Sequence, residues 1–231
     1  MISVGVPERS QKGSQIFADE LKRFANCHRD PRLVRISEQV SGEGAVAVVG
    51  RRGVGVTAVS DGLAGAGVAV RETGEIAVLV IAEVLKPEDR ATLAELRRGG
   101  TPVLIVLNKA DLAGSGPGGP LATARGRAEQ LRALTGSPVI PMVALLAGAV
   151  LTAQTVAALR VLAAEPADLS SPDAFLRAPH RVPVEMRVEL LETLDRFGIA
   201  HAALALSRGA EAETLPGLLR SLSGIDQVLP A

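Results

Sequence analysis

Short continuous apolar runs alternate with segments of helical periodicity along the middle of the chain. The apolar runs are bounded by glycine, proline or polar residues, which is typical of buried strands in a parallel sheet, and they cover residues 45–49, 76–82, 102–107 and 139–143. A shorter run over 68–70 is a candidate for a further, stubby strand. Helices are predicted between the runs over 58–63, 87–98 and 122–134. This alternation predicts an α/β fold with a three-layer parallel sheet.

The two ends of the chain show a different pattern. Residues 15–41 are predicted to be helical, because Ile16, Phe17, Leu21, Phe24 and Ala25 have helix-compatible spacing. In the central part of the chain, a loop is predicted over 114–120. Toward the C-terminus, a proline-rich connector over 166–183 precedes helices predicted over 184–197, 200–207 and 211–222. We therefore expect an N-terminal helical arm (1–44), a central domain (45–165) and a linker with a C-terminal helical region (166–231).

Composition narrows the range of functions. The chain has 25 basic and 25 acidic residues, so it lacks the basic excess of a nucleic-acid-binding protein. The start of the chain lacks the apolar core of a signal peptide, and the apolar stretch 139–153 is too short for a membrane span. A single cysteine, Cys27, fits a reducing compartment. We expect a cytoplasmic protein with no integral membrane segment.

A glycine-rich octet follows the first predicted strand. It consists of Gly50, Arg51, Arg52, Gly53, Val54, Gly55, Val56 and Thr57. Its spacing is that of a phosphate-binding loop, G-x-x-x-x-G-K-[ST], in which backbone N–H groups surround an anion and the final hydroxyl binds Mg²⁺. Thr57 is therefore the candidate metal ligand. The alternative is a glycine-rich turn that binds nothing.

Val56 occupies the position of the lysine in this pattern. A hydrogen bond to a charged group contributes about 1.5–3 kcal/mol, so the loss should weaken nucleotide binding about ten- to a hundredfold. Arg51 and Arg52 are the neighbouring cations, and we expect their side chains to point outward rather than to replace the lysine.

A second motif, Asn108-Lys109-Ala110-Asp111, follows the predicted strand 102–107. The Asp111 carboxylate can accept hydrogen bonds from N1–H and N2–H of guanine, a pair that adenine does not offer. The Lys109 stem can lie along the base, and Asn108 can connect this loop to the glycine-rich octet. Further along, Ala144 is placed for its N–H to contact guanine O6, although Val143 stands where a serine is usual. The alternatives here are a polar turn and a plain strand end.

With these motifs, residues 45–165 resemble the translation-factor-related P-loop GTPases. The stretches 187–198 and 218–226 resemble the helical region that follows the GTPase domain in bacterial dynamin-like proteins. The resemblance implies a shortened P-loop GTPase sheet with helical extensions. The implied cofactor is GTP or GDP with Mg²⁺, or none if the loop has lost its ligand.

The chain departs from this family between Thr57 and Ile76. Residues 58–75 are too few for switch I, two strands and the D-x-x-G motif of switch II. The D-x-x-G matches that do occur, at 111–114 and 195–198, come after the base motif and are attributed to chance. Phosphoryl transfer needs charge stabilisation and a positioned water, so we assign no catalytic residue and expect no GTP hydrolysis.

Three functions follow from these features. The first is a pseudo-GTPase that acts through a protein partner, such as a related complete GTPase in a homo- or heterodimer. The second is a weak guanine-nucleotide binder whose occupancy is sensed. The third is a GTPase completed in trans by a partner residue. The remaining polar groups suggest no further site, since the histidines are isolated and the charges of 88–98 are predicted to form a solvated helix face.

Overall fold

Five parallel strands form the centre of the molecule. The computed structural model describes residues 45–231, so the predicted N-terminal arm, with its helix over 15–41, lies outside the described residues. The strands are β1 (Val46–Val49), β2 (Val70–Arg71), β3 (Ile76–Ala82), β4 (Val103–Asn108) and β5 (Val139–Pro141). Their order in the sheet is β2-β1-β3-β4-β5, and every neighbouring pair is parallel. The predicted α/β class with a shortened parallel sheet is confirmed.

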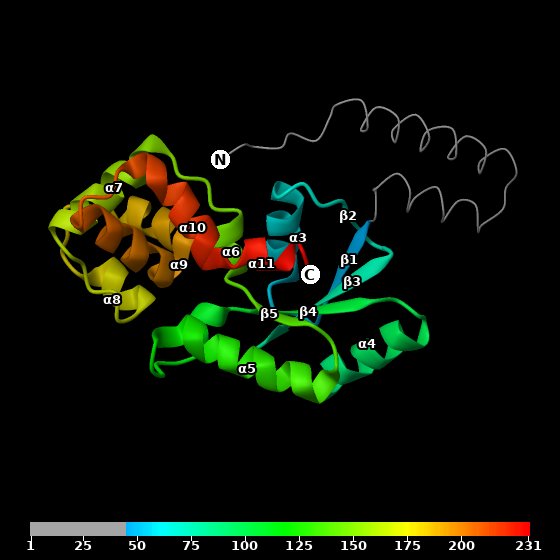
Figure 1. The fold of residues 1–231 in the computed structure, drawn as a ribbon. Coiled ribbons are helices and arrows are strands. Elements are labelled where there is room, and N and C mark those ends of the chain that lie inside the picture. The colour runs from blue at the N-terminus through cyan, green and yellow to red at the C-terminus, as the bar shows by residue number, and fades with distance from the viewer. Residues whose placement is uncertain (1–44) are drawn as a thin grey trace, which may run out of the picture.

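Helices cover both faces of this sheet (Figure 1). They are α3 (Val56–Gly65), α4 (Pro87–Arg98), α5 (Gly119–Thr135) and α11 (Ile225–Val228). Successive residues of a strand point to opposite faces, so Val78 and Val80 pack under α3 and α11, whereas Leu79 and Ile81 pack against α4 and α5. This alternation within an almost wholly apolar strand produces the predicted three layers.

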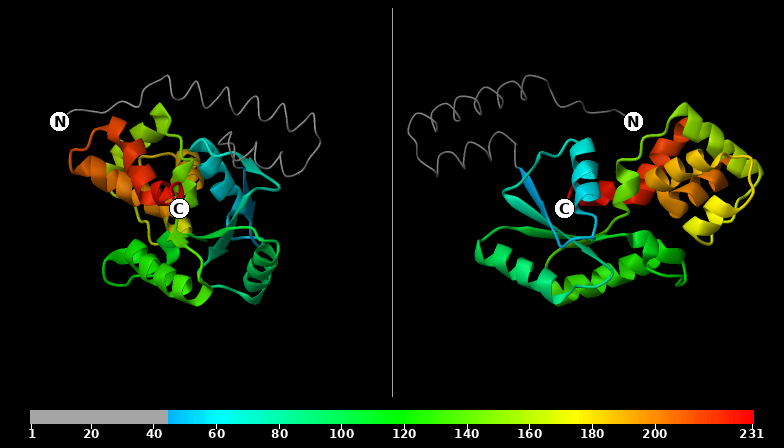
Figure 2. Two further views of the ribbon diagram at one scale, coloured as in Figure 1. Left: turned by 45° about the vertical axis from the view of Figure 1, so that its right-hand side comes forward. Right: turned by 180° about the vertical axis from the view of Figure 1, so that it is seen from behind.

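The remaining helices gather beside the β5 edge of the sheet (Figure 2). After α6 (Ala144–Ala147) the chain forms α7 (Ala153–Ala164), α8 (Pro172–Arg177), α9 (Val184–Ser207), the 3-10 turn η2 (Ala212–Thr214) and α10 (Leu215–Ser223). Leu159, Phe175 and Leu190 are buried at the centre of this helical unit, and its core continues through Ala124 of α5. Throughout residues 45–231 every helix is too short or too polar to cross a lipid bilayer.

The helical unit differs from its sequence prediction at the break in α9, in the connector before it, and over 211–222, where η2 precedes α10. The break expected between 197 and 200 is absent, because Gly198 lies inside α9 and gives Leu146 and Leu194 room to pack closely against that helix. The backbone instead leaves helical geometry at Asp195, with φ 50° and ψ 177°. The connector over 166–183 also contains α8, which begins at Pro172 after Ser171 accepts a hydrogen bond from the Ala174 N–H.

Other boundaries also differ from the sequence prediction. Helix α3 begins two residues before the predicted start, directly after Gly55. Helix α5 begins at Gly119, so the loop predicted over 114–120 is shorter. Strand β5 ends at Pro141 instead of residue 143, because the Val143 N–H donates to the Ser223 carbonyl at the end of α10 and leaves the sheet.

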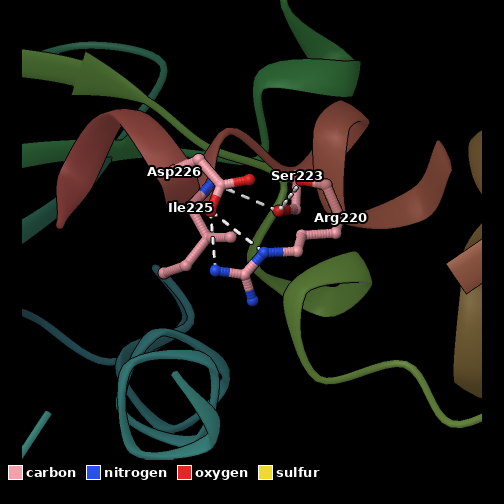
Figure 3. Close-up of polar contacts among 4 residues, drawn as sticks. All are labelled: Arg220, Ser223, Ile225 and Asp226. Carbon is pink, nitrogen blue, oxygen red and sulfur yellow. Dashed lines mark hydrogen bonds and ion pairs between the residues drawn. The ribbon is translucent and has the colours of Figure 1, made fainter. Parts of the chain in front are cut away.

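The turn between α10 and α11 fixes the end of the chain against the sheet (Figure 3). The Arg220 guanidinium donates to Asp226 Oδ1 from Nε at 3.0 Å and from a terminal nitrogen at 2.6 Å. Ser223 Oγ accepts from the Ile225 N–H at 3.2 Å. Gly224 has φ 77°, and a Cβ there would lie 2.8 Å from the Pro141 carbonyl oxygen. These contacts place Ile225 in the core above β3.

Candidate functional site

The candidate site lies at the carboxyl edge of the sheet, beside β1. Strand β2 pairs with one side of β1 and β3 with the other, so the strand order reverses at this point. In open parallel sheets, ligands bind in the crevice outside such a reversal. The glycine-rich loop follows β1 there, and the polar segment that begins with Asn108 ends β4 close by.

The glycine-rich loop can adopt its conformation only with glycine at several positions. A Cβ at Gly50 would lie 2.7 Å from the Val80 carbonyl oxygen, and Gly53 and Gly55 have φ of 88° and 91°. Gly55 caps α3, whose first turn leaves N–H groups without intrahelical partners. Within residues 45–231, the N–H groups of Gly53, Gly55 and residues 56–58 have no hydrogen-bond acceptor. They form a cluster of donors at a helix N-terminus, which suits an anion.

The position of the missing lysine is filled by an apolar side chain. Val56 is half-buried and packs with the apolar cluster beneath α3, and its Cγ2 lies 3.1 Å from where a Cβ of Gly50 would be. Arg51 does not replace the lysine, because its Nε lies 3.2 and 3.3 Å from the two carboxylate oxygens of Asp89. Arg52 is exposed. Neither neighbouring arginine therefore takes the place of the lysine at the cluster of N–H donors.

Asp89, the partner of Arg51, lies in an environment that the sequence analysis did not predict. It was assigned to a solvated helix face, whereas its side chain is 1% exposed. Besides Arg51 it accepts from the Lys86 N–H at 2.9 Å, as the third residue of α4. An acidic third residue of a helix is a recognisable signal, and it would have identified the bond to the Lys86 N–H, though not the pairing with Arg51.

Asn108 joins the two motifs, as predicted. Its side chain is 4% exposed, and its Nδ2 donates to the Val54 carbonyl oxygen at 2.9 Å. Its Oδ1 accepts from the Ala144 N–H at 3.0 Å. Gly55 packs so closely on this amide that a Cβ there would lie 2.3 Å from Nδ2. One buried side chain thus links the loops after β1, β4 and β5.

The contact to Asn108 changes the role expected for Ala144. The resemblance assigned its N–H to guanine O6, but in the structure this N–H is engaged by Asn108. The physical reason is that a buried amide oxygen needs a donor, and this N–H is the one within reach. Any recognition of a base by this region rests more heavily on Asp111.

Lys109 and Asp111 lie at the surface beyond Asn108. Lys109 is exposed with φ 59°, at the start of the 3-10 turn η1 (Ala110–Leu112). Asp111 is half-buried, and burial raises the pKa of its carboxyl above the usual value. Asp195 raises this pKa further, while Lys109 and Arg196 lower it. Asp195 and Arg196 belong to α9, so the helical unit reaches the base motif, a proximity that no sequence signal indicates.

Thr57 is the only residue of the site that was predicted to bind a metal. Its side chain is exposed in the first turn of α3. Residues 45–231 contain no group of three or more acidic, histidine or cysteine side chains that could hold a cation. A single hydroxyl does not make a resident Mg²⁺ site, since Mg²⁺ needs octahedral oxygen ligands and takes several from water or phosphate. These side chains fit Mg²⁺ only as a companion of bound phosphates.

The segment between α3 and β3 stays away from this edge of the sheet. Strand β2 pairs only with the first half of β1, in the register Val46 with Val70 and Ala47 with Arg71. The chain then crosses under the amino end of β1, where the Glu75 N–H donates to the Ala45 carbonyl and a Cβ on Gly74 would lie 2.3 Å from the same oxygen. As predicted from its length, this segment holds one short strand and no loop over the site.

Comparisons with known proteins add little to this geometry. The sequence matches no known protein-family model and no curated protein. Among solved structures it is similar to a GTP-binding protein from the hyperthermophilic archaeon Sulfolobus solfataricus in complex with GDP. That match has 19% sequence identity and a TM-score of 0.30, and it covers 61% of this chain and 62% of the other. The chain thus spans about three fifths of the length of that protein.

Proposed function

We propose that this protein binds a guanine nucleotide in a GTPase-type site without hydrolysing it, and that it acts through a protein partner. The observation that carries this proposal is the buried Asn108 side chain, which fixes the glycine-rich loop against the base motif. This contact holds the loop after β1 next to the segment that carries Asp111. The same link brings the glycine-rich loop and the base motif to one edge of the sheet, which supports a joint role in binding one nucleotide.

The phosphates would be held by backbone groups. The N–H donors of Gly53, Gly55 and the first turn of α3 face no acceptor within residues 45–231, and the helix N-terminus adds a partial positive charge. Without the lysine, this cluster supplies hydrogen bonds but no full charge. We therefore expect affinity about ten- to a hundredfold below that of the same loop with lysine.

The base would be selected by Asp111. Its carboxylate is half-buried, and burial raises its pKa because the ionised form loses contact with water. The N1–H and N2–H groups of guanine would supply two donors and stabilise that ionised form. Adenine presents no such pair. Selection for guanine over adenine is the direct consequence.

The proposal that nucleotide is retained intact rests on what surrounds the phosphates. Cleavage of the terminal phosphoryl group needs a cation to neutralise developing charge and a group that positions the attacking water. Val56 supplies no charge, Arg51 is paired with Asp89, and the short crossing over 66–75 stays at the opposite edge. A bound nucleotide would act by its presence, and a protein partner would read it.

A nucleotide-free pseudo-GTPase is the second candidate. The specific observation in its favour is the engagement of the Ala144 N–H by Asn108, which closes part of the base-binding region. The two candidates differ in whether purified protein carries guanine nucleotide. A related GTPase or a second copy of this chain is the partner that we propose in both cases.

Chromatography of the nucleotide released from the purified, denatured protein tests this function. We expect guanine nucleotide to be released, and GTP added to the native protein to be recovered unchanged. Protein that carries no nucleotide and takes up none would favour the second candidate. Multiple turnovers of GTP to GDP that the Thr57→Ala substitution abolishes would contradict both.

A further inference from the structure

An apolar cleft opens at the amino edge of the sheet, opposite the candidate site. It has a volume of about 470 Å³ and lies between the starts of β1, β3 and β4, helix α3 and the end of the chain. Most of its walls are aliphatic, including Val46, Leu63, Val68, Ile76, Leu104 and Val228. Ile76 and Leu229 at its rim are 44% and 40% exposed. Exposed aliphatic surface around a hollow of this size is typical of a surface that another apolar group covers.

Hydrogen bonds within the described fold hold two sides of the cleft in place. Helix α11 forms one wall and is held by the Arg220–Asp226 pair and the Ser223 contact (Figure 3). At the far side, Arg97 donates to the Thr135 carbonyl oxygen and to Ser137 Oγ. Aliphatic side chains make up most of the remaining lining. The cleft therefore favours an apolar occupant.

The sequence before β1 contains such an occupant. Phe17, Leu21 and Phe24 have the i, i+4, i+7 spacing of one helical stripe, while Asp19 and Lys22 fall on the other side of the same helix. The chain has four phenylalanines and no tryptophan or tyrosine. The other two, at 175 and 197, pack in the helical unit, so the stripe holds half of the aromatic side chains of this protein.

We propose that the stripe of Phe17, Leu21 and Phe24 docks into this cleft as an intramolecular helix. The segment joins the described fold at Ala45, directly before Val46, which itself lines the cleft. Residues 25–44 separate the stripe from this point, and Pro31 among them bends or breaks a helix, so the stripe can turn back to the cleft. The docked helix would cover the exposed rim and complete the layer of helices on this face. This inference is independent of nucleotide binding.

The composition of the chain allows a direct test in the full-length protein. Cys27 is its only cysteine, and it lies one helical turn after Phe24, so a bimane label there reports the position of the stripe. The substitution Ile76→Trp places the sole tryptophan at the rim of the cleft, and tryptophan quenches bimane at short range. Val150→Trp is the matched control, because Val150 is 76% exposed on the segment before α7, away from the cleft.

We expect loss of bimane fluorescence with Ile76→Trp and full fluorescence with Val150→Trp. The double substitution Phe17→Ser and Phe24→Ser should restore fluorescence in the Ile76→Trp protein, whereas Asp19→Ser on the polar side should not. Equal fluorescence in the two tryptophan proteins would overturn the proposal.

A second copy of the chain is the other occupant that this experiment can detect. Labelled protein without tryptophan is mixed with unlabelled Ile76→Trp protein. Intramolecular docking predicts no quenching in the mixture. In the Ile76→Trp protein that itself carries the bimane label, it predicts quenching that does not depend on protein concentration. Quenching that appears on mixing would show that the stripe binds another copy, and would contradict the intramolecular assignment.

Discussion

The substitution Val56→Lys restores the residue that the phosphate-binding pattern requires, and it tests whether the glycine-rich loop still binds phosphate. Val56 begins α3, is half-buried and lies against Gly50. A lysine stem can take the place of the valine methyl groups over the loop while its ammonium group reaches the cluster of N–H donors. The change should cost about 1 kcal/mol of folding free energy through lost apolar contact. It introduces no buried charge, because the ammonium group ends where the loop meets solvent.

The expected gain in affinity follows from the charge of the ligand. A charge-assisted hydrogen bond contributes about 1.5–3 kcal/mol, so the dissociation constants of GDP and GTP should fall about ten- to a hundredfold. Guanosine has no phosphate, and its affinity should stay unchanged. Displacement of a fluorescent GDP analogue measures all three ligands in one format, free of tryptophan background because the chain has none.

Two results would refute the reasoning. If folded Val56→Lys protein binds GDP no more tightly than the unsubstituted protein, the loop does not hold phosphate. If Val56→Gln, which adds length without charge, improves binding as much as lysine does, the gain comes from packing. We expect Val56→Gln to leave the affinity for GDP close to that of the unsubstituted protein.

Further predictions concern the base motif, the buried amide and two glycines. Asp111→Asn should weaken binding of guanosine and GDP alike by about ten- to a hundredfold, whereas the same change at the exposed Asp173 should have no effect. Burial raises the pKa of Asp111, so the folded state holds its proton more tightly than the unfolded state, and the free energy of unfolding should fall as pH rises from 3.8 through the raised pKa. The free energy of unfolding of the Asp111→Asn protein, measured by urea denaturation across this pH range, should lack that decrease. A pH dependence identical to that of the unsubstituted protein would contradict the raised pKa of Asp111. Asn108→Ala should lower the free energy of unfolding by about 2–4 kcal/mol because it leaves two buried backbone groups without partners, and a loss below about 0.5 kcal/mol would argue against the link between the loops. Gly198→Ala should destabilise by about 1–3 kcal/mol through contact with Leu194, while Gly126→Ala on the open side of α5 should stabilise by about 0.5–1 kcal/mol, as thermal unfolding can show.

The central sheet could be predicted from the sequence because its strands are continuous apolar runs between glycines and prolines. Strand β3 was predicted with its observed bounds, Ile76–Ala82, and α4 likewise began at Pro87 and ended at Arg98. The helical unit was less predictable, since tertiary contacts decide its boundaries. Gly198 resembles a helix end locally, but it lies inside α9 because Leu146 packs against it.

The site was predictable where a short motif carries the chemistry. The spacing of the glycine loop and the position of Asn108 both led to the link that the structure contains. The pairing of Arg51 with Asp89 and the approach of Asp195 to Asp111 depend on residues distant in sequence, so no local pattern could indicate them. The hydrogen bond from the Ala144 N–H to Asn108 likewise joins residues distant in sequence, so no local pattern could indicate it.

Calorimetric titration of the nucleotide-stripped, full-length protein with GDP, and in parallel with ADP, tests the central claim most directly. The account predicts saturable binding of GDP and no binding of ADP at the same concentrations, because the Asp111 carboxylate has donors to bond only on guanine. Absence of heat with GDP from folded protein, or equal affinity for ADP, would contradict it.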